Sequence, residues 1–327
     1  MTIRISIAMC TQNGERFLSR QLESIAAQKR LPDELVVCDD RSSDATAEIL
    51  WNFARRAPFA VQVSVNEQHL GSTRNFEKSI SLCSGEIVAL ADQDDTWYPN
   101  KLEIIEQAFC WPVAPVAVFS DADLIDGNSL PLNTRLWNAV GFTTSEQRRA
   151  ASGAALNLVI KHPIVTGATM AFRRSFFDFL RPFPPEVIHD RWMSILLASS
   201  GPVASISEPL MRYRKHRDQQ IGVRPETLPG RMQIARLKGE LLYFGEIEFF
   251  RRALIHLERR YKIVPRALDA IPEIEKKISH LERRVRLRRS AITRFPAVLR
   301  EVCNHGYWRY SAGWQSVAKD LFLPANG

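Results

Sequence analysis

Acidic and polar side chains gather directly after apolar, β-rich runs in the first third of the chain. Three such clusters follow the runs 3–9, 35–38 and 87–91: Cys10-Thr11-Gln12-Asn13-Gly14, Asp39-Asp40 and Asp92-Gln93-Asp94-Asp95. Carboxylates supply the oxygen ligands that Mg²⁺ and Mn²⁺ favour, and a cation held in this way can bridge to a diphosphate. Any one aspartate in such a place is more often a helix cap or a turn residue. Three clusters together indicate one site that holds phosphate through a bound cation.

The elements that carry these clusters predict a mostly parallel sheet flanked by helices. β-rich runs alternate with segments whose apolar residues fall at helical spacing, which implies parallel pairing with right-handed crossovers. Ligands of such sheets bind beyond the carboxyl ends of the strands, where the clusters lie. A dinucleotide-binding fold is disfavoured, because no G-x-G-x-x-G follows the first strand and no G-x-x-x-x-G-K-[ST] occurs. The turn after the first strand has one glycine, Gly14, and the residue that follows it, Glu15, is a poor neighbour for pyrophosphate.

The charge of the chain is unevenly distributed. The 327 residues carry a formal net charge of +8. Residues 224–327 hold 21 Lys/Arg and 11 Asp/Glu, whereas residues 1–223 hold 23 and 25. Two glycines and two prolines within 222–230 mark a boundary. We therefore expect a near-neutral α/β domain over 1–223 and a helical, basic C-terminal region over 224–327.

The cysteines and the hydropathy favour a cytoplasmic protein. The five cysteines are widely spaced and include no Cys-x-x-Cys pair, which argues against a disulfide framework or a structural zinc site. The first ten residues hold no long apolar stretch and are interpreted as a strand rather than a signal peptide. No run approaches the roughly 18 apolar residues that a membrane-spanning helix needs.

Six segments, in order between residues 3 and 222, resemble the family 2 glycosyltransferases, whose fold is called GT-A. They are SIAMCTQNGERFLSRQLESIAAQ, LVVCDDRSSDAT, GSTRNFEKSISLCSGEIVALADQDDTWYPNKL, VTGATMAFRRS, HDRWMSILLA and MRYRKHRDQQIG. The ADQDDTW form is most similar to rhamnosyltransferase-like members that build bacterial surface polysaccharides. The resemblance implies an inverting enzyme that depends on Mn²⁺ or Mg²⁺. Its substrates would be a nucleotide-diphosphate sugar and an acceptor hydroxyl.

The resemblance also implies a set of donor-binding residues. The turn after the first strand and Asp40 would hold the nucleobase, Asp92 would contact the ribose, and one arginine would reach the donor. The residues are Cys10, Thr11, Gln12, Asp40, Arg74 and Asp92. Many members of the family have an aromatic residue where this chain has Gln12, whose amide offers hydrogen bonds but a lesser stacking face.

The remaining carried-over roles concern the metal and the proton transfer. Asp94 would ligate the metal with help from Asp95 and His216, and His216 would lie on the late segment that closes over the diphosphate. Asp190 would be the general base that takes the proton of the acceptor hydroxyl. From the residues alone, Asp190 also fits a helix N-cap, and His216, among several basic residues, also fits a solvated basic loop.

The basic C-terminal region has three interpretations. It fits a solvated helical appendage that packs on the catalytic domain. It also fits a membrane-surface region at the inner face of the cell membrane, where basic helices with aromatic rims bind anionic headgroups. That would suit a lipid-linked saccharide acceptor. Nucleic-acid binding is the third choice and is not expected, since no nucleic-acid motif accompanies the charge.

Two other classes of function stay open beside the glycosyltransferase. A sugar-phosphate nucleotidyltransferase would also use acids on an α/β sheet, but would want a glycine-rich basic loop near the first strand. A non-catalytic protein that binds membrane or nucleic acid would depend on the C-terminal region alone. For the donor, dTDP-rhamnose is the first expectation by resemblance, followed by UDP-sugars.

Overall fold

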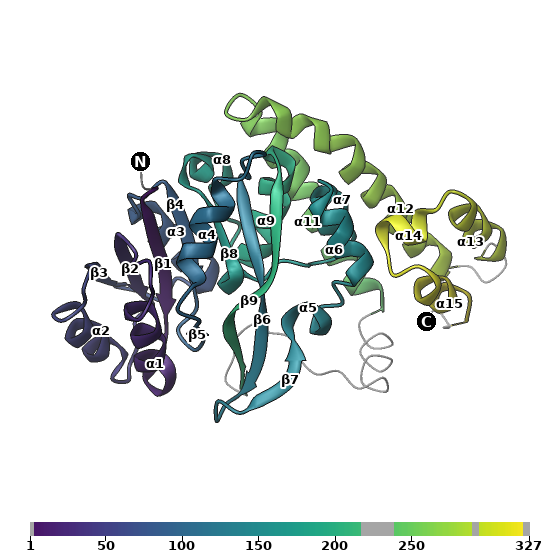
Figure 1. Cartoon of the computed structure of the whole chain (residues 1–327). Helices are drawn as coiled ribbons and strands as arrows, with labels where there is room; N and C mark the ends of the chain where they lie inside the picture. Colours follow the sequence, from purple (N-terminus) through teal and green to yellow (C-terminus); the bar gives the residue numbers. More distant parts are fainter. Residues whose placement is uncertain (1–2, 217–238, 290–293, 323–327) are drawn as a thin grey trace. The chain divides into compact units, whose positions relative to one another are not determined.

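The computed structural model describes residues 3–216, 239–289 and 294–322 (Figure 1). By their internal contacts the residues form two compact units, Met1–Ala155 with Ile164–Val223, and Leu156–Pro163 with Arg224–Gly327. The boundary region 222–230 lies outside the described residues. The assignment of separate domains to 1–223 and 224–327 stays a prediction.

The first unit is built on one nine-stranded sheet in the described part of the chain. The strands are β1 (Ile5–Thr11), β2 (Glu34–Asp39), β3 (Ala60–Val65), β4 (Ile87–Ala91), β5 (Thr96–Trp97), β6 (Ala117–Asp126), β7 (Pro131–Arg135), β8 (Met170–Arg173) and β9 (Val203–Lys215). Their order is β3-β2-β1-β4-β8-β6-β9-β5, and β7 pairs with β6. β1 to β4 pair in parallel, as do β6 and β9, while β8 runs antiparallel to both of its neighbours. The predicted α/β fold with a mostly parallel sheet is confirmed.

Helices connect the strands and cover the sheet. The longer ones are α1 (Glu15–Ala26), α2 (Thr46–Ala54), α3 (Ser72–Leu82), α4 (Lys101–Phe109) and α9 (His189–Ser200). The shorter ones are α5 (Leu136–Ala139), α6 (Thr144–Ala151), α8 (Phe177–Leu180), η1 (Gly167–Thr169) and η2 (Arg174–Phe176). α1 contacts α2, whereas α3 contacts α9. Apolar residues three and four apart on α1, such as Leu18, Leu22 and Ile25, are buried in the core, which is why this segment is helical.

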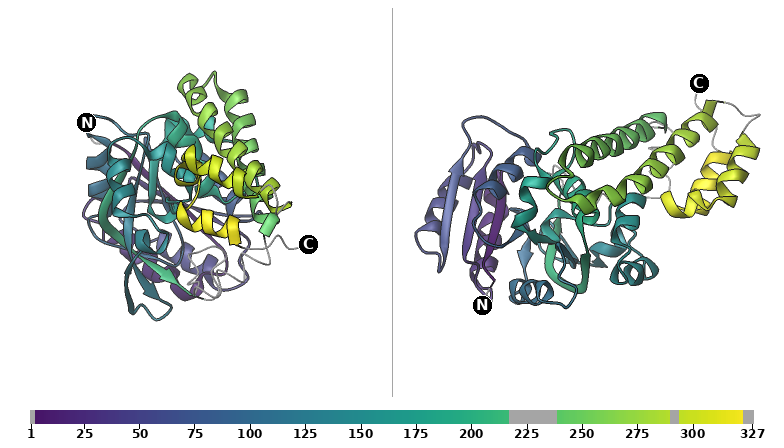
Figure 2. Two further views of the ribbon diagram at one scale, coloured as in Figure 1. Left: turned by 90° about the vertical axis from the view of Figure 1, so that its right-hand side faces the viewer. Right: turned by 90° about the horizontal axis from the view of Figure 1, so that it is seen from above.

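The second unit is helical in the described residues. Its elements are α7 (Ala155–Lys161), α11 (Gly239–Arg260), η3 (Pro265–Ala270), α12 (Ile271–Arg289), α13 (Arg294–Cys303), α14 (Gly306–Tyr310) and α15 (Trp314–Phe322). α11 and α12 pack side by side (Figure 2). On α12 the apolar residues Ile274, Ile278, Leu281 and Val285 are buried, as their alternating spacing of three and four predicts. None of the described helices has both the length and the apolar character that crossing a membrane requires.

A buried polar network joins the last helices of this unit. The Arg284 guanidinium donates to both carboxylate oxygens of Asp320, at 2.6 and 3.0 Å, and the Tyr307 hydroxyl donates to Asp320 at 2.8 Å. A second pair lies nearby, where His280 Nδ1 is 2.6 Å from Glu301 Oε2. All of these side chains are almost fully buried. A buried carboxylate without its cation is costly, so this network fixes how α12, α13 and α15 pack.

Replacement of Arg284 by Met is expected to destabilise the second unit by about 3–5 kcal/mol, because it leaves the Asp320 charge buried without its partner. Urea unfolding of the full chain, followed by far-UV circular dichroism, measures the change. The matched control is Arg252→Met, which removes an exposed pair with Glu248 one helical turn away on α11 and is expected to cost less than about 0.5 kcal/mol. Equal losses for the two variants would contradict this account of the network.

Candidate functional site

The three polar clusters lie at the carboxyl ends of neighbouring strands. β1 is the middle strand, and its register pairs Thr11 with Asp39 on β2 and Met9 with Ala91 on β4. The turn after β1, Asp40 after β2 and the acids after β4 therefore share one edge of the sheet. The convergence that the parallel pattern predicted is found.

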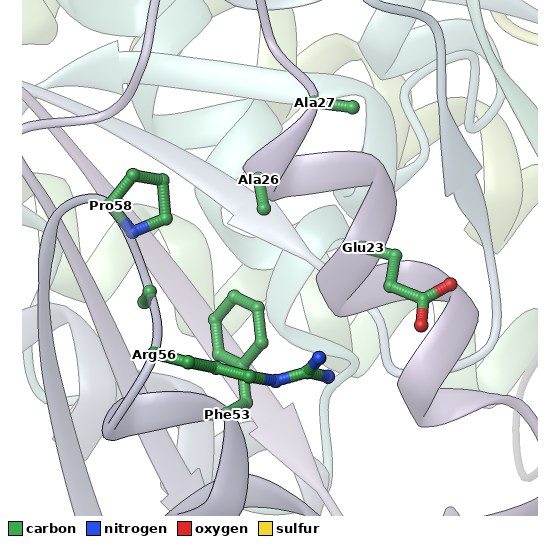
Figure 3. Close-up of a pocket in the computed structure, with 7 residues that line it drawn as sticks. Glu23, Ala26, Ala27, Phe53, Arg56 and Pro58 are labelled. Carbon is green, nitrogen blue, oxygen red and sulfur yellow. The ribbon is translucent and has the colours of Figure 1, made fainter.

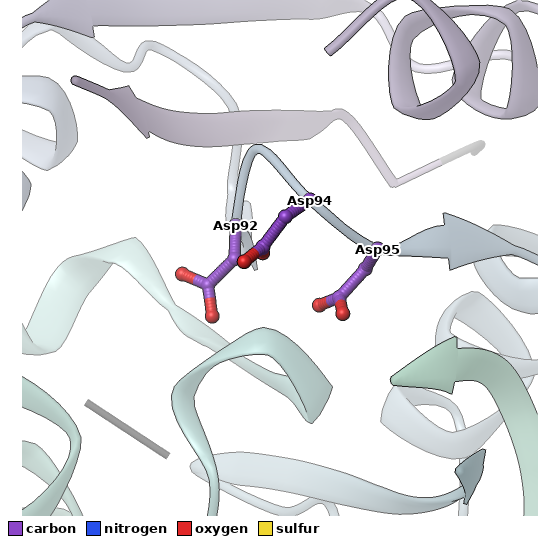
Figure 4. Close-up of side chains that lie close together, drawn as sticks. All are labelled: Asp92, Asp94 and Asp95. Carbon is purple, nitrogen blue, oxygen red and sulfur yellow. The ribbon is translucent and has the colours of Figure 1, made fainter. Parts of the chain in front are cut away.

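The centre of the site is a group of three carboxylates after β4 (Figure 4). Ligand atoms of Asp92, Asp94 and Asp95 all lie within 4.8 Å of one another. Asp95 is fully buried, and its Oδ1 accepts a hydrogen bond from the Arg214 backbone N–H at 2.9 Å. Its Oδ2 is buried with no hydrogen-bond partner among the described residues. Oxygen donors this close together, one of them unsatisfied, fit a hard divalent cation such as Mg²⁺ or Mn²⁺.

The crowding of these acids perturbs their protonation. Burial, followed by the charges of Asp94 and Asp190, raises the pKa of Asp92 to about 7. Burial, followed by the charges of Asp94 and Asp92, raises the pKa of Asp95 well above its ordinary value. A bound cation would stabilise the charged carboxylates and reverse this effect. The site thus holds carboxylates that need a positive charge to stay ionised together.

His216 follows β9 and reaches the same group. Its Nε2 lies 2.7 Å from Asp94 Oδ2, and its ring packs on Phe17 of α1 at 4.9 Å between centroids. Only 11% of the His216 side chain is exposed. The solvated basic loop that the flanking charges allowed is therefore wrong for this histidine. Residues 217–222, the rest of the segment expected to close over the diphosphate, lie outside the described residues.

Asp190 approaches the acids from another element. It is the second residue of α9, and its Oδ2 accepts a hydrogen bond from the Gly167 backbone N–H of η1 at 3.1 Å. The N-cap of α9 is Ile188, with no side-chain cap, so the alternative of Asp190 as a helix cap is wrong. The preceding His189 is buried and stacks on Phe76 of α3, which fixes the start of α9. The charge of Asp190 contributes to the raised pKa of Asp92, so the two carboxylates share one electrostatic environment.

The Asp40 carboxylate is already engaged in the protein. Its Oδ1 accepts from Asn66 Nδ2 and the Leu70 backbone N–H, at 2.9 and 2.7 Å, and its Oδ2 accepts from the Gly71 backbone N–H at 2.9 Å. The His69 Nδ1 lies 2.8 Å from the same Oδ2. Two carboxylate oxygens offer about four acceptor positions. A nucleobase N–H at Asp40 would thus have to displace one of these contacts, and His69, with 55% of its side chain exposed, is the most accessible of them.

The turn after β1 is held by Gln93. Gln93 Oε1 accepts from the Gln12 backbone N–H at 2.8 Å, and Gln93 Nε2 donates to the Gln12 carbonyl at 3.0 Å. A Cβ at Gly14 would lie 2.3 Å from Gln93 Oε1, so a larger residue there would force the Gln93 amide to move away from the turn. The Gln12 side chain instead reaches the His69 ring, with Nε2 3.1 Å from Nδ1.

The other residues of the predicted donor set, Thr11, Cys10 and Arg74, have no described hydrogen bond or ion pair with the carboxylate group after β4. The Thr11 hydroxyl is buried and donates to Asp39 Oδ1 at 2.7 Å. Cys10 is half-buried, and burial raises the pKa of its thiol well above the ordinary value. Arg74 on α3 pairs with Glu77 at 2.7 Å, and no described contact joins it to the acids. The structure therefore gathers Asp92, Asp94, Asp95, Asp190 and His216, but not Arg74.

Two buried cations next to the acids were not predicted from the sequence. Lys101, at the start of α4, is 1% exposed; its Nζ donates to the Ala168 carbonyl at 2.8 Å and lies 4.0 Å from the centre of the Trp97 ring. Burial lowers its pKa to about 7, whereas Asp95 and Asp92 oppose that shift. Arg214 on β9 is fully buried and donates from Nε to the Asp94 carbonyl at 2.7 Å. Both lie within the quoted sequence segments, but charge and spacing alone do not distinguish a buried cation from a solvated one.

A separate open pocket of about 300 Å³ lies elsewhere in the first unit (Figure 3). It is lined by Glu23, Ala26, Ala27, Phe53, Arg56, Ala57 and Pro58. These residues belong to the C-terminal ends of α1 and α2, which in alternating α/β folds face the amino ends of the strands. It is therefore not part of the carboxylate site.

Comparison with known proteins adds independent findings. Residues 6–181 match Glycosyl transferase family 2. The chain is 33% identical over 193 residues to the UDP-Glc:alpha-D-GlcNAc-diphosphoundecaprenol beta-1,3-glucosyltransferase WfgD of Escherichia coli, covering 59% of this chain and 69% of that one. It is 25% identical over 229 residues to the dTDP-rhamnosyl transferase RfbG of Shigella flexneri, covering 65% and 73%. A glycosyltransferase of Nostoc sp. is 26% identical over 223 residues, and the match spans 65% of the length of each protein.

Solved structures share the fold. The structure of S. aureus TarS 1-349 in complex with UDP-GlcNAc has a TM-score of 0.54 at 16% identity, over 98% of this chain and 93% of that one. The mannosyltransferase PcManGT from Pyrobaculum calidifontis, in complex with GDP-Man and Mn²⁺, has a TM-score of 0.53 at 18% identity, over 98% and 85%. At these identities the likeness shows the GT-A fold and nothing finer.

Replacement of Asp94 by Ala is expected to weaken Mn²⁺ binding by at least about tenfold, because it removes one of three converging carboxylates. Isothermal titration with MnCl₂, with and without nucleotide, measures the affinity. The control is Asp178→Ala on α8, an exposed acid that pairs with Arg181. Unchanged Mn²⁺ affinity in Asp94→Ala would show that the carboxylate group is not a metal site.

Replacement of Lys101 by Met is expected to lower the melting temperature in metal-free buffer, because Asp92 and Asp95 then lose a buried counter-charge. The expected loss is about 1–3 kcal/mol, the scale of an unsatisfied buried polar group. Saturating Mn²⁺ is expected to restore most of it, since the ion supplies positive charge to the same acids. A loss that is identical with and without Mn²⁺ would assign Lys101 a packing role only. Differential scanning fluorimetry gives both values.

Proposed function

The chain belongs to Glycosyl transferase family 2, and from this premise we propose that it moves a sugar from a nucleotide-diphosphate sugar to a saccharide hydroxyl, with inversion at the anomeric carbon. The observation that carries the proposal is the convergence of Asp92, Asp94 and Asp95 with Asp190, which arrives from a different element. With a divalent cation bound, such a site would hold a diphosphate, and Asp190 would accept a proton beside it. Cell-surface polysaccharide synthesis in the cytoplasm is the proposed setting.

The donor would occupy the ends of β1, β2 and β4. Asp92 would contact the ribose, and the base would lie against Gln12, His69 and Asp40. Support comes from the exposure of the His69 ring between the Gln12 amide and the Asp40 carboxylate. The donor is proposed to be dTDP-rhamnose or a UDP-sugar, the donor classes that the names of the relatives RfbG and WfgD give.

The metal would be held by Asp94, Asp95 and His216, which fit a divalent cation by donor type and proximity. When bound, Mn²⁺ or Mg²⁺ would offset the negative charge that develops on the diphosphate leaving group. Lys101 and Arg214 would hold the acid-bearing loop in place before the donor arrives. The hydrogen bond from Arg214 to the Asp94 carbonyl supports this role for Arg214, and the burial of Lys101 beside Asp95 and Asp92 supports it for Lys101.

Asp190 would act as the general base. Its carboxylate lies in the first turn of α9 and accepts a hydrogen bond from the Gly167 backbone N–H, which orients it. It would take the proton of the acceptor hydroxyl while the hydroxyl oxygen bonds to the anomeric carbon and the bond from that carbon to the diphosphate oxygen breaks. Attack from the face opposite the leaving group gives inversion.

A lipid-linked saccharide is the proposed acceptor, at the inner face of the cell membrane. The support is the relative WfgD, which is named for its acceptor, a GlcNAc-diphosphoundecaprenol. The acceptor and the peripheral membrane location are proposals for this chain.

Replacement of Asp190 by Asn is expected to lower the rate of sugar transfer by about 10²–10⁴-fold while donor binding is kept, because the amide cannot take a proton. Binding is measured by the thermal shift with dTDP and UDP compounds, each with and without Mn²⁺. Transfer is measured as nucleoside diphosphate released in the presence of a lipid-linked acceptor. Asp178→Asn is the matched control and is expected to behave like the wild type. Full transfer activity in Asp190→Asn would refute the assignment of the base, and the absence of a shift with any nucleotide would refute the proposed donor site.

A further inference from the structure

Two short helices of the second unit expose regularly spaced apolar side chains. The residues fall four apart on each helix: Phe295, Leu299 and Cys303 on α13, and Trp314, Ala318 and Phe322 on α15. We call these six residues the apolar stripes. Spacing of four keeps a set on one side of its helix. α13 and α15 contact each other (Figure 1), so the stripes belong to one packed pair of helices.

The exposure of the apolar stripes is large for side chains of this kind. Phe295 is 66% exposed, Trp314 67% and Phe322 80%. The opposite faces of the same helices are packed, since Val298 and Val317 are buried together with Tyr307. α13 and α15 therefore have a complete core side and still present large apolar groups outward. A group of such residues marks a surface that binds another apolar phase.

The solvent-facing charges around the apolar stripes are mostly positive. Between residues 294 and 322, all of which the structure describes, the acids are Glu301 and Asp320, and both are buried. Glu301 is paired with His280 and Arg283, and Asp320 with Arg284. The cations of the same stretch stay at the surface or half-buried: Arg294, Arg300 and Lys319, and also Arg309, which pairs with Glu273 of α12 at 3.3 Å. Because the acids are withdrawn into the interior, the outward charge of this segment is basic.

We propose that α13 and α15 dock on the surface of an anionic lipid bilayer. The apolar stripes would enter the boundary between headgroups and acyl chains, where Trp and Phe are favoured, and the cations would meet anionic headgroups. A second copy of the chain is a poor occupant, because residues 224–327 carry 21 Lys/Arg against 11 Asp/Glu and two such surfaces repel. The idea that this surface meets a lipid-linked acceptor rests on the proposed function. The binding itself is tested without donor, acceptor or metal.

Flotation of the full chain with vesicles tests the proposal. Binding to phosphatidylglycerol/phosphatidylcholine vesicles is expected to exceed binding to pure phosphatidylcholine at least tenfold, and to weaken as salt is raised. The double variant Phe295→Ser/Trp314→Ser is expected to lose at least tenfold in binding. Its control is Trp51→Ser/Trp111→Ser, which removes two exposed tryptophans of the first unit, 47% and 44% exposed. Equal binding of the two double variants would overturn the proposal.

The two exposed cysteines supply an internal comparison. Cys303 lies in an apolar stripe, whereas Cys110 lies in the first unit, and both are exposed. A polarity-sensitive maleimide dye is attached at Cys303 in a Cys110→Ser chain and at Cys110 in a Cys303→Ser chain. Anionic vesicles are expected to shift the emission of the dye at Cys303 to the blue and to leave the dye at Cys110 unchanged. Equal responses at the two positions would contradict docking through α13.

Light scattering and donor hydrolysis complete the test. If the Phe295→Ser/Trp314→Ser variant changes the molar mass of the chain in lipid-free buffer, the apolar stripes are a protein interface and the membrane proposal fails.

Hydrolysis of UDP- and dTDP-sugars in lipid-free buffer is measured on the same preparations. Vesicle binding without hydrolysis would refute the donor proposal alone, and hydrolysis without vesicle binding would refute the docking surface alone.

Discussion

The mutual repulsion of carboxylates at the end of β4 is the constraint around which the first unit is arranged. Asp92, Asp94 and Asp95 lie within a few ångströms of one another, and the last of them is fully buried. Like charges in a medium of low dielectric cannot all stay ionised without compensation. Two buried cations supply part of it: Lys101, close by at the start of α4, and Arg214 on β9, far along the chain. The fold thus brings together segments more than a hundred residues apart to support one loop of four residues.

The sequence predicted where the acids meet but not how they are supported. Parallel pairing places consecutive strand ends at one edge, so alternating strands and helices were enough to bring Asp40 and Asp92 to the same side. The approach of Asp190 followed from the family resemblance, because nothing in the spacing links residue 190 to residue 92. The burial of Lys101 and Arg214 could not be predicted, since a basic residue near a turn has the same sequence signature whether it is solvated or enclosed.

Hydrogen bonding also changed the interpretation of single residues. Asp40 was expected to serve the nucleobase, and in the structure it organises the loop 66–71 through backbone and side-chain donors. The same loop carries His69 to the site, although no sequence pattern indicated this residue. In the second unit the sequence indicated the excess of basic residues, whereas the burial of Glu301 and Asp320 depends on tertiary ion pairs that composition does not reveal.

The hydrogen bonds from Gln93 to the turn after β1 bear on how the preference for a donor nucleobase could change. Gln93 binds the backbone N–H and carbonyl of residue 12, not its side chain. Gln93 therefore holds the turn through the backbone of residue 12, and a side chain at position 14 would need the Gln93 amide to move or to be replaced by a smaller group. The side chain at position 12 meets the scaffold through His69, whose Nδ1 lies 2.8 Å from Asp40 Oδ2. A library that varies residues 12 and 69 and leaves 14 and 93 untouched would sample nucleobase preference without disturbing the strand end that carries it.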